Sequence, residues 1–459
     1  MSVVGAFIVP HPPLIITEIG NGREKDIQKT IDAFEVVAKE IATLKPETII
    51  ISSPHATSYS DYFHIPNQKE IMGSFENFGC KEISFQEELD LELIQEIESI
   101  SEKDSFPAGT KGETYQELDH GTMVPLYFIR KKFPKSKIVI VGLTSYSLER
   151  NYKMGIIIQE AIEKLNRKVV YIASGDLSHK LQEYGPYGYI EEGPIYDERV
   201  MNICAKGNFK ELFDFSDDFL DKAAICGHPS FTIMAGVLDG IEVEAKLLSH
   251  ETITGVGYGI CTYHPKRKNP NCKYLEAYLD EIERKRKKEY HPDEYVSLAI
   301  TTIYEYIKNK KRIEIPKNTS KELLTTQAGV FVSIHKKGEL RGCIGTIQAT
   351  TSCIAEEIIQ NAISAATRDP RFLPITEEEL PFLEINVDVL QPPEIINSKE
   401  KLNPKKYGVI VSCQGKRGLL LPDIEGINTV EEQIEIAKQK GNITEDNYQL
   451  ERFEVIRHF

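Results

Sequence analysis

Short apolar runs alternate with amphipathic segments along the first part of the chain. Residues 3–9 and 47–53 are continuous apolar or β-branched runs, which is typical of strands buried on both faces of a sheet. Similar runs cover residues 137–143 and 168–173. The segments between these runs place apolar residues at helical spacing, as over 25–44. This alternation predicts an α/β fold over residues 1–265, with a mostly parallel sheet covered by helices on both faces.

Further segments complete this domain and indicate a second one. The spacing of apolar residues predicts helices over 85–97 and 115–133, and closing strands over 242–248 and 257–263. Residues 266–289 are rich in Lys, Glu and Arg, which indicates a charged linker with an amphipathic helix. Over residues 290–459, hairpin-forming strands and a few helices predict a smaller α+β domain.

The composition narrows the class of protein. The chain has 459 residues, of which 41% are hydrophobic and 27% are charged, as in a soluble globular protein of two or three domains. The formal net charge of -15 argues against nucleic acid or an anionic membrane as the main partner. An apolar run of about 18 residues is absent, so no spanning helix is expected. Eight cysteines without a CxxC pair indicate free thiols in a reducing cytoplasm.

Two histidines follow two of the predicted strands. His11 stands within a Pro-His-Pro-Pro segment, and His55 follows Pro54. Proline ends a strand because it cannot donate to the sheet ladder. Both imidazoles are therefore expected at the carboxyl edge of the sheet, where ligands bind in open α/β sheets. A structural histidine with satisfied hydrogen bonds is the alternative at either position.

Three further side chains stand in strand-exit or loop positions: His120, His179 and Glu251. Two histidines and one carboxylate on one face of a divalent metal are the arrangement of non-haem Fe(II) oxygenases. An additional histidine without a metal bond then serves as acid and base, because an imidazole titrates near neutral pH. Zinc held by the same ligands in a hydrolase fits the pattern equally well. The residues alone thus indicate a metal or hydrolytic site without deciding its reaction.

Five short motifs occur in a fixed order in the first domain. They are Pro10-His11-Pro12-Pro13, Ser53-Pro54-His55, Asp119-His120-Gly121-Thr122, Gly175-Asp176-Leu177-Ser178-His179, and Ser249-His250-Glu251 with Gly255-Val256-Gly257-Tyr258-Gly259. In this order the motifs resemble those of the catalytic subunit of class III extradiol ring-cleavage dioxygenases, whose fold the Memo proteins share. The resemblance implies that the ligands of Fe(II) are His11, His55 and Glu251. It also implies that His179 is the acid/base histidine and that His120 holds bound oxygen or a substrate oxygen.

Alternatives stay open at this site. His250 is adjacent to Glu251 and would compete with it as a ligand. Zn(II) or another divalent metal fits the same ligand types as Fe(II). Memo relatives keep the fold with only part of the ligand set, so the fold alone does not establish ring cleavage.

The second domain carries its own motifs. Its segments Leu340-Arg341-Gly342-Cys343-Ile344-Gly345-Thr346, Thr367-Arg368-Asp369-Pro370-Arg371-Phe372 and Gly418-Leu419-Leu420-Leu421-Pro422 resemble the AMME-candidate-region family. The candidate site of this domain is Cys343 with Arg341, because an arginine beside a thiol lowers the thiol pKa and favours thiolate. The alternative is a small buried side chain in a hairpin. The pair of domains is similar to the fused component of the AmmeMemoRadiSam system, which also contains a radical SAM enzyme.

The sequence therefore predicts a cytoplasmic, two-domain protein, and the resemblance implies that it is an oxidoreductase. Its first domain is expected to be an Fe(II)-dependent extradiol-type dioxygenase that acts on O2 and a catechol-type or related anionic small molecule. The alternative is a metal-binding, Memo-like scaffold that works with a radical SAM partner and does not cleave rings. Nucleic acid and membrane partners are not expected, and a homo-oligomer is compatible with the sequence. The substrate cannot be read from the residues.

Overall fold

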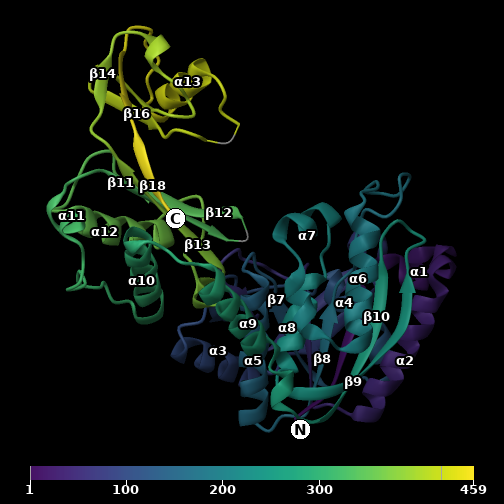
Figure 1. Cartoon of the computed structure of the whole chain (residues 1–459). Coiled ribbons are helices and arrows are strands. Elements are labelled where there is room, and N and C mark those ends of the chain that lie inside the picture. Colours follow the sequence, from purple (N-terminus) through teal and green to yellow (C-terminus); the bar gives the residue numbers. More distant parts are fainter. Residues whose placement is uncertain (1, 337, 425) are drawn as a thin grey trace. The chain divides into compact units, whose positions relative to one another are not determined.

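The computed structural model describes residues 2–336, 338–424 and 426–459, with the side chains of residues 286–289 left out (Figure 1). The chain folds into two compact units, of which the first ends at Asp280 and the second begins at Glu281. Helix α9 (Tyr274–Glu289) runs across this point, within the segment predicted as a charged linker. Within the described residues, every helix is too short or too polar to cross a bilayer.

A six-stranded sheet organises the first unit, in the order β7-β2-β8-β1-β10-β9. Its strands are β1 (Val3–Val9), β2 (Thr48–Ser53), β7 (Lys137–Gly142), β8 (Val169–Ser174), β9 (Ile241–Glu251) and β10 (Tyr258–Lys268). The first four strands in this order are parallel, and β10 and β9 add an antiparallel edge. Ile172 of β8 lies level with Phe7 on one side and Ile51 on the other. The predicted α/β fold with a mostly parallel sheet is confirmed.

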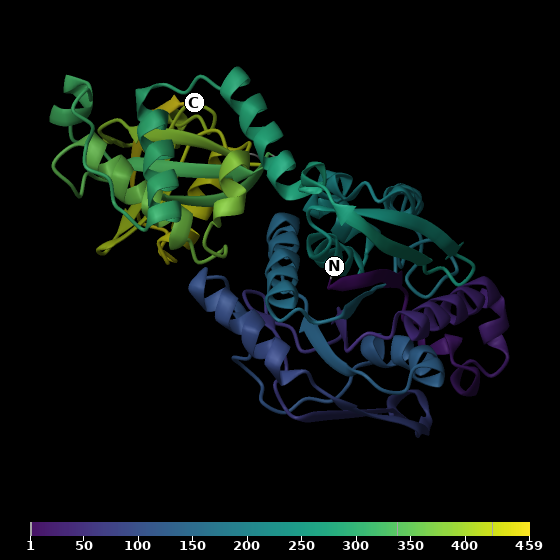
Figure 2. The same ribbon diagram turned by 90° about the horizontal axis from the view of Figure 1, so that it is seen from below.

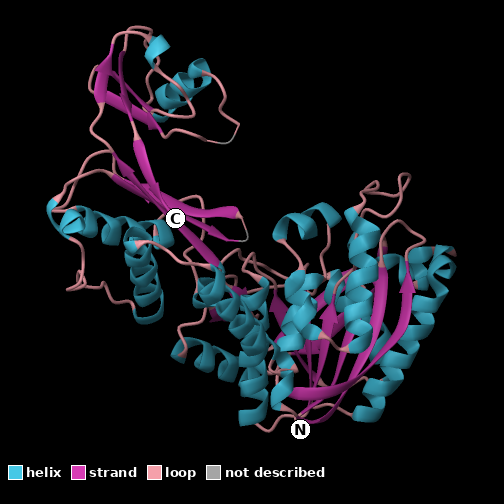
Figure 3. Cartoon of the chain, viewed as in Figure 1, coloured by secondary structure: helices cyan, strands magenta, loops and turns pink. Residues whose placement is uncertain are grey.

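Helices cover both faces of this sheet (Figure 3). Helices α2 and α4 pack together against one face, whereas α5 and α8 pack together against the other. The helices of this unit are α1 (Thr17–Gly20), α2 (Gln28–Leu44), α3 (Leu91–Lys103), α4 (His120–Lys132), α5 (Leu148–Lys164), α6 (Glu192–Lys206), α7 (Asp217–Ala223) and α8 (His228–Val237), with 3₁₀ turns η1 (Pro13–Ile15), η2 (Arg23–Ile27), η3 (Glu76–Phe78), η4 (Phe209–Asp214) and η5 (Pro270–Cys272). The parallel strands are buried on both sides, as their unbroken apolar runs require.

The predicted helix over residues 85–97 is wrong in its first half. Strands β4 (Glu70–Phe75) and β5 (Cys80–Glu88) form a hairpin there, and α3 starts only at Leu91. Asp90 sets this start, because its carboxylate accepts a hydrogen bond from the Leu93 backbone N–H at the helix N-terminus. The remaining short strands of the unit are β3 (Phe63–His64) and β6 (Ala108–Gly109).

The second unit contains two four-stranded sheets. The first has the order β12-β11-β13-β18, and the second has the order β14-β17-β15-β16. Its strands are β11 (Val330–Lys336), β12 (Glu339–Gly345), β13 (Leu383–Leu390), β14 (Glu394–Ile396), β15 (Gly408–Cys413), β16 (Lys416–Leu420), β17 (Gln449–Phe453) and β18 (Val455–His458). Its helices are α10 (Glu294–Asn309), α11 (Lys321–Thr325), α12 (Ile354–Thr367) and α13 (Val430–Lys440), with η6 (Glu377–Phe382) and η7 (Lys399–Lys401).

The first sheet of this unit packs on both of its faces. Val330, Val332 and Ile334 alternate along β11 and join the core formed with α10 and α12. Phe331 points to the opposite face, where it joins Leu390, Ile410, Leu419 and Phe453 between the two sheets. In Figure 2 green helices lie in front of the green strands and yellow strands of the second sheet lie behind them. The α+β character predicted for this part of the chain is confirmed.

Two glycines let helices α5 and α8 approach closely. A Cβ atom on Gly155 would lie 2.0 Å from the carbonyl oxygen of Ile233, and one on Gly236 would lie 2.0 Å from that of Tyr152. Replacing Gly155 by Ala should therefore lower the free energy of unfolding by about 1–3 kcal/mol through overpacking, although Ala is intrinsically the better helix former. Urea unfolding of the full-length protein measures this change.

The control for this prediction is Glu160→Ala, an exposed position on the same helix. It should leave the unfolding midpoint nearly unchanged. A Gly155→Ala protein as stable as the wild type would show that the two helices can separate without cost.

Candidate metal centre

Three neighbouring parallel strands are each followed by a candidate site residue, which lies two positions after the last residue of its strand. His11 follows β1, His55 follows β2 and Asp176 follows β8. The strands lie side by side in the order β2-β8-β1 and run in the same direction. Their carboxyl ends therefore meet at one edge of the sheet, as expected for a ligand site in an open α/β sheet.

The nitrogen atoms of the first two side chains converge with a sulfur atom. His55 Nε2 lies 3.1 Å from His11 Nε2, and Cys226 Sγ lies 3.7 Å from the same His11 nitrogen. The three donor atoms all lie within 4.8 Å of one another, close enough to bind one metal ion. Two imidazoles and one thiolate suit zinc, copper and iron better than magnesium or calcium, which prefer oxygen ligands.

A hydrogen-bond chain fixes the tautomer of His11. The Ser174 hydroxyl donates to the carbonyl oxygen of Gly121 at 2.6 Å, so its single proton is already used. It can only accept from His11 Nδ1, which lies 3.0 Å away and must carry the ring proton. The lone pair of a neutral His11 is then on Nε2, the atom that faces His55 and Cys226. This second hydrogen bond is the device that orients a metal-binding imidazole in proteins.

The surroundings of His55 and Cys226 set their protonation states in a way that favours binding of a cation. Burial by neighbouring groups, followed by the nearby His11 and His120, lowers the pKa of His55 to about 4, although the residue as a whole is exposed. His55 is therefore neutral at pH 7 and able to bind a metal. Burial raises the pKa of the Cys226 thiol well above its usual range. That thiol keeps its proton until a cation displaces it, which couples metal binding to proton release.

Asp176 lies between the cluster and His179. Its Oδ1 accepts a hydrogen bond from the His11 backbone N–H at 2.8 Å. Its Oδ2 lies 3.9 Å from His11 Nε2 and 3.9 Å from His179 Nε2. Burial opposes ionisation of Asp176, but these imidazoles and the hydrogen bonds outweigh it and hold its pKa below the usual range. The backbone N–H of Asp176 also donates to Cys226 Sγ at 3.2 Å, which favours a thiolate there.

His120 is the first residue of helix α4, behind the helix-capping Asp119. The Asp119 carboxylate accepts from the backbone N–H of Thr122 and from the Ser53 hydroxyl, which anchors the helix start beside the strand that precedes His55. The His120 ring lies 4.0 Å from the His55 ring and 5.5 Å from the His11 ring, measured between centroids. The structure thus brings His11, His55, His120 and His179 around one point.

Glu251 does not join this group. It ends β9, and its Oε2 accepts hydrogen bonds at 2.7 Å from both the backbone N–H and the hydroxyl of Thr30, in the first turn of α2. A carboxylate is favourable there because helix N-termini carry unpaired N–H groups and partial positive charge. His250, the competing candidate, faces Asp197 at 3.5 Å. The prediction of Glu251 as the third metal ligand finds no support, and Cys226 stands with the two histidines instead.

Sequence reasoning missed Cys226 because nothing in its local pattern marks a ligand. It lies in a loop just before α8, more than two hundred residues from His11. A single cysteine without a CxxC partner has no metal-binding signature. The one available signal was the short Cys226-Gly227-His228-Pro229 segment, and its histidine has a structural role. His228 is buried, with Nδ1 3.1 Å from the Tyr196 hydroxyl and Nε2 2.9 Å from the Leu212 carbonyl oxygen.

In the second unit, Arg341 and Cys343 do not act on each other as expected. The pairing of β11 with β12 shifts between Ile334 and His335, which makes Arg341 the extra residue of a β-bulge. Its guanidinium donates to both carboxylate oxygens of Glu379, at 2.9 and 3.1 Å. Burial raises the pKa of the Cys343 thiol. The expectation that Arg341 favours a Cys343 thiolate is therefore wrong, and a functional role of Cys343 stays a prediction.

The first and second segments of the AMME-candidate-region pattern meet at Cys343. Its backbone N–H donates to Asp369 Oδ2 at 2.9 Å, and its sulfur accepts from the Ser333 hydroxyl at 3.2 Å. Arg371 donates to both oxygens of Asp369 and to the Cys343 carbonyl oxygen. These contacts tie the loop after α12 to β12, which is a structural reason for both motifs.

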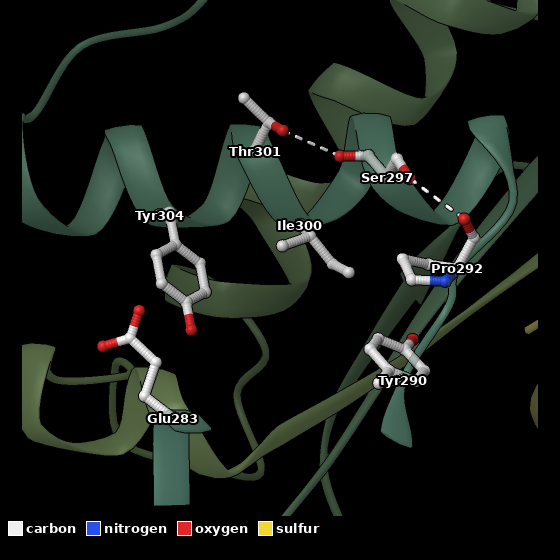
Figure 4. Close-up of a pocket in the computed structure, with 7 residues that line it drawn as sticks. All are labelled: Glu283, Tyr290, Pro292, Ser297, Ile300, Thr301 and Tyr304. Carbon is white, nitrogen blue, oxygen red and sulfur yellow. Dashed lines mark hydrogen bonds between the residues drawn. The ribbon is translucent and has the colours of Figure 1, made fainter. Parts of the chain in front are cut away.

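A separate hollow of about 290 Å³ lies beside α10 in the second unit (Figure 4). Tyr290 and Tyr304 line it, and their hydroxyls donate to backbone carbonyl oxygens of Ile385 and Leu380. The side chain of Glu283 adds a carboxylate. The cysteine and arginine of the candidate second site do not line this hollow.

Comparisons with known proteins agree with the two-unit architecture. A family model described as the catalytic LigB subunit of aromatic ring-opening dioxygenase matches residues 5–261, and the AMMECR1 model matches residues 296–458. A protein of Clostridium acetobutylicum is 42% identical, over 100% of this chain and 99% of its own length. A protein of Thermotoga maritima is 50% identical over 171 residues, which cover 37% of this chain and 97% of the relative.

Two solved structures are also similar to parts of the chain. An uncharacterized protein of Pyrococcus horikoshii is 32% identical, with a TM-score of 0.33, over 36% of this chain and 88% of its own. An uncharacterized protein of Escherichia coli K12 is 12% identical, with a TM-score of 0.39, over 56% of this chain and 99% of its own.

Removing the Glu251 carboxylate should leave metal binding intact. Glu251→Ala deprives the first turn of α2 of its acceptor, so we expect the free energy of unfolding to fall by about 1–2 kcal/mol. Metal per chain after loading and dialysis should equal that of the wild type, whereas His55→Ala should lose the metal. A Glu251→Ala protein that loses metal as His55→Ala does would restore the glutamate as a ligand.

The Asp369–Arg371 pair predicts a pH effect on stability. The Arg371 guanidinium lowers the pKa of Asp369 from 3.8 to about 2. The ion pair therefore makes its full contribution to the free energy of unfolding above pH 3.8, and this contribution is lost as the pH falls through about 2. Arg371 is half exposed, so solvent screens the ion pair and reduces its effect. We therefore expect Asp369→Asn to lower the free energy of unfolding by about 1–2 kcal/mol at pH 7.

Urea unfolding of the full-length wild type and of Asp369→Asn at pH 7 and pH 3 tests whether the stabilisation by the ion pair decreases toward low pH. The stability difference between Asp369→Asn and the wild type should shrink at pH 3, and Glu384→Gln at an exposed position should show no such trend. A difference that grows toward low pH would contradict the assignment.

Proposed function

Because the chain belongs to the family of the catalytic LigB subunit of aromatic ring-opening dioxygenase, with an AMMECR1 domain after it, we propose that its first unit is a metal-dependent oxidoreductase. The proposed reaction is an extradiol-type dioxygenation of a catechol-type or related anionic small molecule by O2. The observation that carries the proposal is the convergence of His11 Nε2, His55 Nε2 and Cys226 Sγ beside two further histidines.

The donor set fits a transition metal and differs from the expected two-histidine, one-carboxylate set. His11, His55 and Cys226 would hold the metal, and Fe(II) is the proposed ion because it accepts imidazole and thiolate and reacts with O2. A bound metal would supply a Lewis acid and a place for the anionic oxygens of the substrate. The orientation of His11 by Ser174 supports this assignment, because a histidine held in this tautomer directs a lone pair at the cluster.

The chain's own residues would handle the protons. His179 is the proposed acid and base, since its Nε2 lies 3.9 Å from Asp176 and its ring is partly open to solvent. It would take the proton of a substrate hydroxyl and return it to the product. Asp176 would stabilise the imidazolium while the proton is held there. His120 would donate a hydrogen bond to a substrate oxygen from its place at the start of α4.

A second function is a metal-binding scaffold that works with a radical SAM partner and does not cleave rings. The observation that favours it is the thiol at the position where a ring-cleaving site was expected to use a carboxylate. The fused AMMECR1 domain also favours it, because a catabolic dioxygenase has no evident use for a second domain. All eight cysteines are free, which supports a reducing, cytoplasmic setting for either function.

The deciding experiment measures metal and O2 uptake on full-length protein purified without air. The wild type should bind one iron per chain and consume O2 when catechols are added. Cys226→Ala should weaken metal retention by about tenfold or more. The matched control is Cys272→Ala, a buried cysteine outside the site, which should retain the metal.

A third variant separates binding from chemistry. His179→Ala should keep the iron and lose O2 uptake by about a hundredfold or more, as expected for an acid/base group. Iron without O2 uptake in the wild type would contradict ring cleavage and favour the scaffold function. A wild-type protein that retains no metal would contradict both functions.

A further inference from the structure

A tyrosine-bearing loop stands between β8 and α6, directly after His179. Residues 180–190 include Tyr184, Tyr187 and Tyr189, all of them exposed. At its tip, Gly185-Pro186-Tyr187-Gly188 forms a turn in which the Gly188 N–H donates to the Gly185 carbonyl oxygen at 3.4 Å. Proline at the second position favours such a turn, and glycine at the fourth supplies a φ of 78°. The sequence of the turn therefore presents Tyr187 in a defined direction.

The loop is tied to the connection between β9 and β10. Gln182 Nε2 donates to the carbonyl oxygens of Thr252 and Ile253, at 3.2 and 3.1 Å. The Leu181 backbone N–H donates to the Gly255 carbonyl oxygen at 3.2 Å. Gly185 lies against Gly255 so closely that a Cβ on Gly185 would be 3.3 Å from the Gly255 Cα. These contacts hold the loop without involving any of the site histidines.

The ring of Tyr187 rests on the imidazole of His179. Their centroids are 5.2 Å apart and their planes are tilted by 33°, within the range of favourable aromatic pairs. Tyr187 remains 61% exposed, whereas Tyr184 in the same loop is 100% exposed. Tyr187 is therefore partly covered beside the His179 ring, whereas Tyr184 is fully open to solvent.

His179 has few other contacts that set the direction of its ring. Its Nε2 lies 3.9 Å from Asp176 Oδ2, which is too long for a hydrogen bond. Its backbone N–H donates to the Ala224 carbonyl oxygen at 3.3 Å, which fixes the main chain but not the side chain. The tilted ring of Tyr187 thus adds an aromatic contact to the longer electrostatic contact between His179 and Asp176.

We propose that Tyr187 is a positioning residue for His179, holding its imidazole toward Asp176 and the metal cluster by stacking on its outer face. The inference rests on the proposed role of His179 as the acid/base group. The stacking uses the ring of Tyr187 and not its hydroxyl. Phenylalanine at this position preserves the function, and a small side chain lets the imidazole rotate into solvent.

The direct test is NMR of full-length, Zn(II)-loaded protein labelled at histidine Cε1, since Zn(II) is redox-inert. His179→Gln identifies the His179 signal by its loss. The ring current of an aromatic side chain shifts the signals of nearby protons, so Tyr187→Ala should change the position of the His179 Hε1 signal, and Tyr187→Phe should leave it close to its wild-type position. The matched control is Tyr184→Ala, which should not move it. A His179 signal that is the same in Tyr187→Ala and in the wild type would overturn the proposal.

The second readout is turnover of the iron-loaded protein with catechol as the probe. Tyr187→Ala should lower kcat by about tenfold or more with little change in KM, because the misplaced group acts in the chemical step. The Tyr187→Phe protein should keep the kcat of the wild type. A Tyr187→Ala protein that changes KM alone would make the residue a binding contact and overturn the positioning role. If the wild type consumes no O2 with catechol, the proposed reaction fails, and the NMR result alone decides whether Tyr187 holds His179.

Discussion

The parallel pairing of β8 with both β1 and β2 is the constraint on which the site depends. These three strands are level with one another, so the chain leaves the sheet at the same edge three times. Each strand is buried on both faces of the sheet. A shift of one residue would move every side chain of the strand to the opposite face, where it would pack against the other layer of helices. The register of the buried strands therefore also sets the distance between His11 and His55, and the candidate metal centre results from packing that the core requires in any case.

Much of this arrangement could be predicted from local patterns. The apolar runs identified the parallel strands, and the prolines beside His11 and His55 identified the strand ends. Partners that only the folded chain brings together could not be predicted in this way. Glu251 ends a strand, whereas the histidines follow theirs, and its strand lies at the sheet edge beside the start of α2. Cys226 follows no strand, and the loop before α8 brings its sulfur to the histidines.

The second unit shows a different limit. Arg341 and Cys343 are two residues apart on a strand, a spacing that places side chains on the same face. The β-bulge at Arg341 breaks this rule and directs its guanidinium to the buried carboxylate of Glu379. A bulge depends on the pairing of two strands, so the residues of one strand do not reveal it. The loop after α12 brings Asp369 to the backbone of Cys343, which explains why two motifs far apart in sequence belong together.

The ionised Asp176 beside the cluster alters the charge that the site offers a substrate, because a metal-bound thiolate carries the same single negative charge as a metal-bound carboxylate. Two neutral imidazoles and one carboxylate would leave a divalent ion with one positive charge. In the structure, a metal-bound Cys226 thiolate and the ionised Asp176 beside it would together balance a divalent ion completely. A doubly ionised catechol would then enter a site without net positive charge, which is unfavourable in a partly buried position. A substrate that arrives with a proton and gives it up inside the site avoids this cost, provided that a base is already placed to receive the proton. His179 is the proposed base, so under this proposal the orientation of its ring by neighbouring groups matters more here than it would beside a more positive metal.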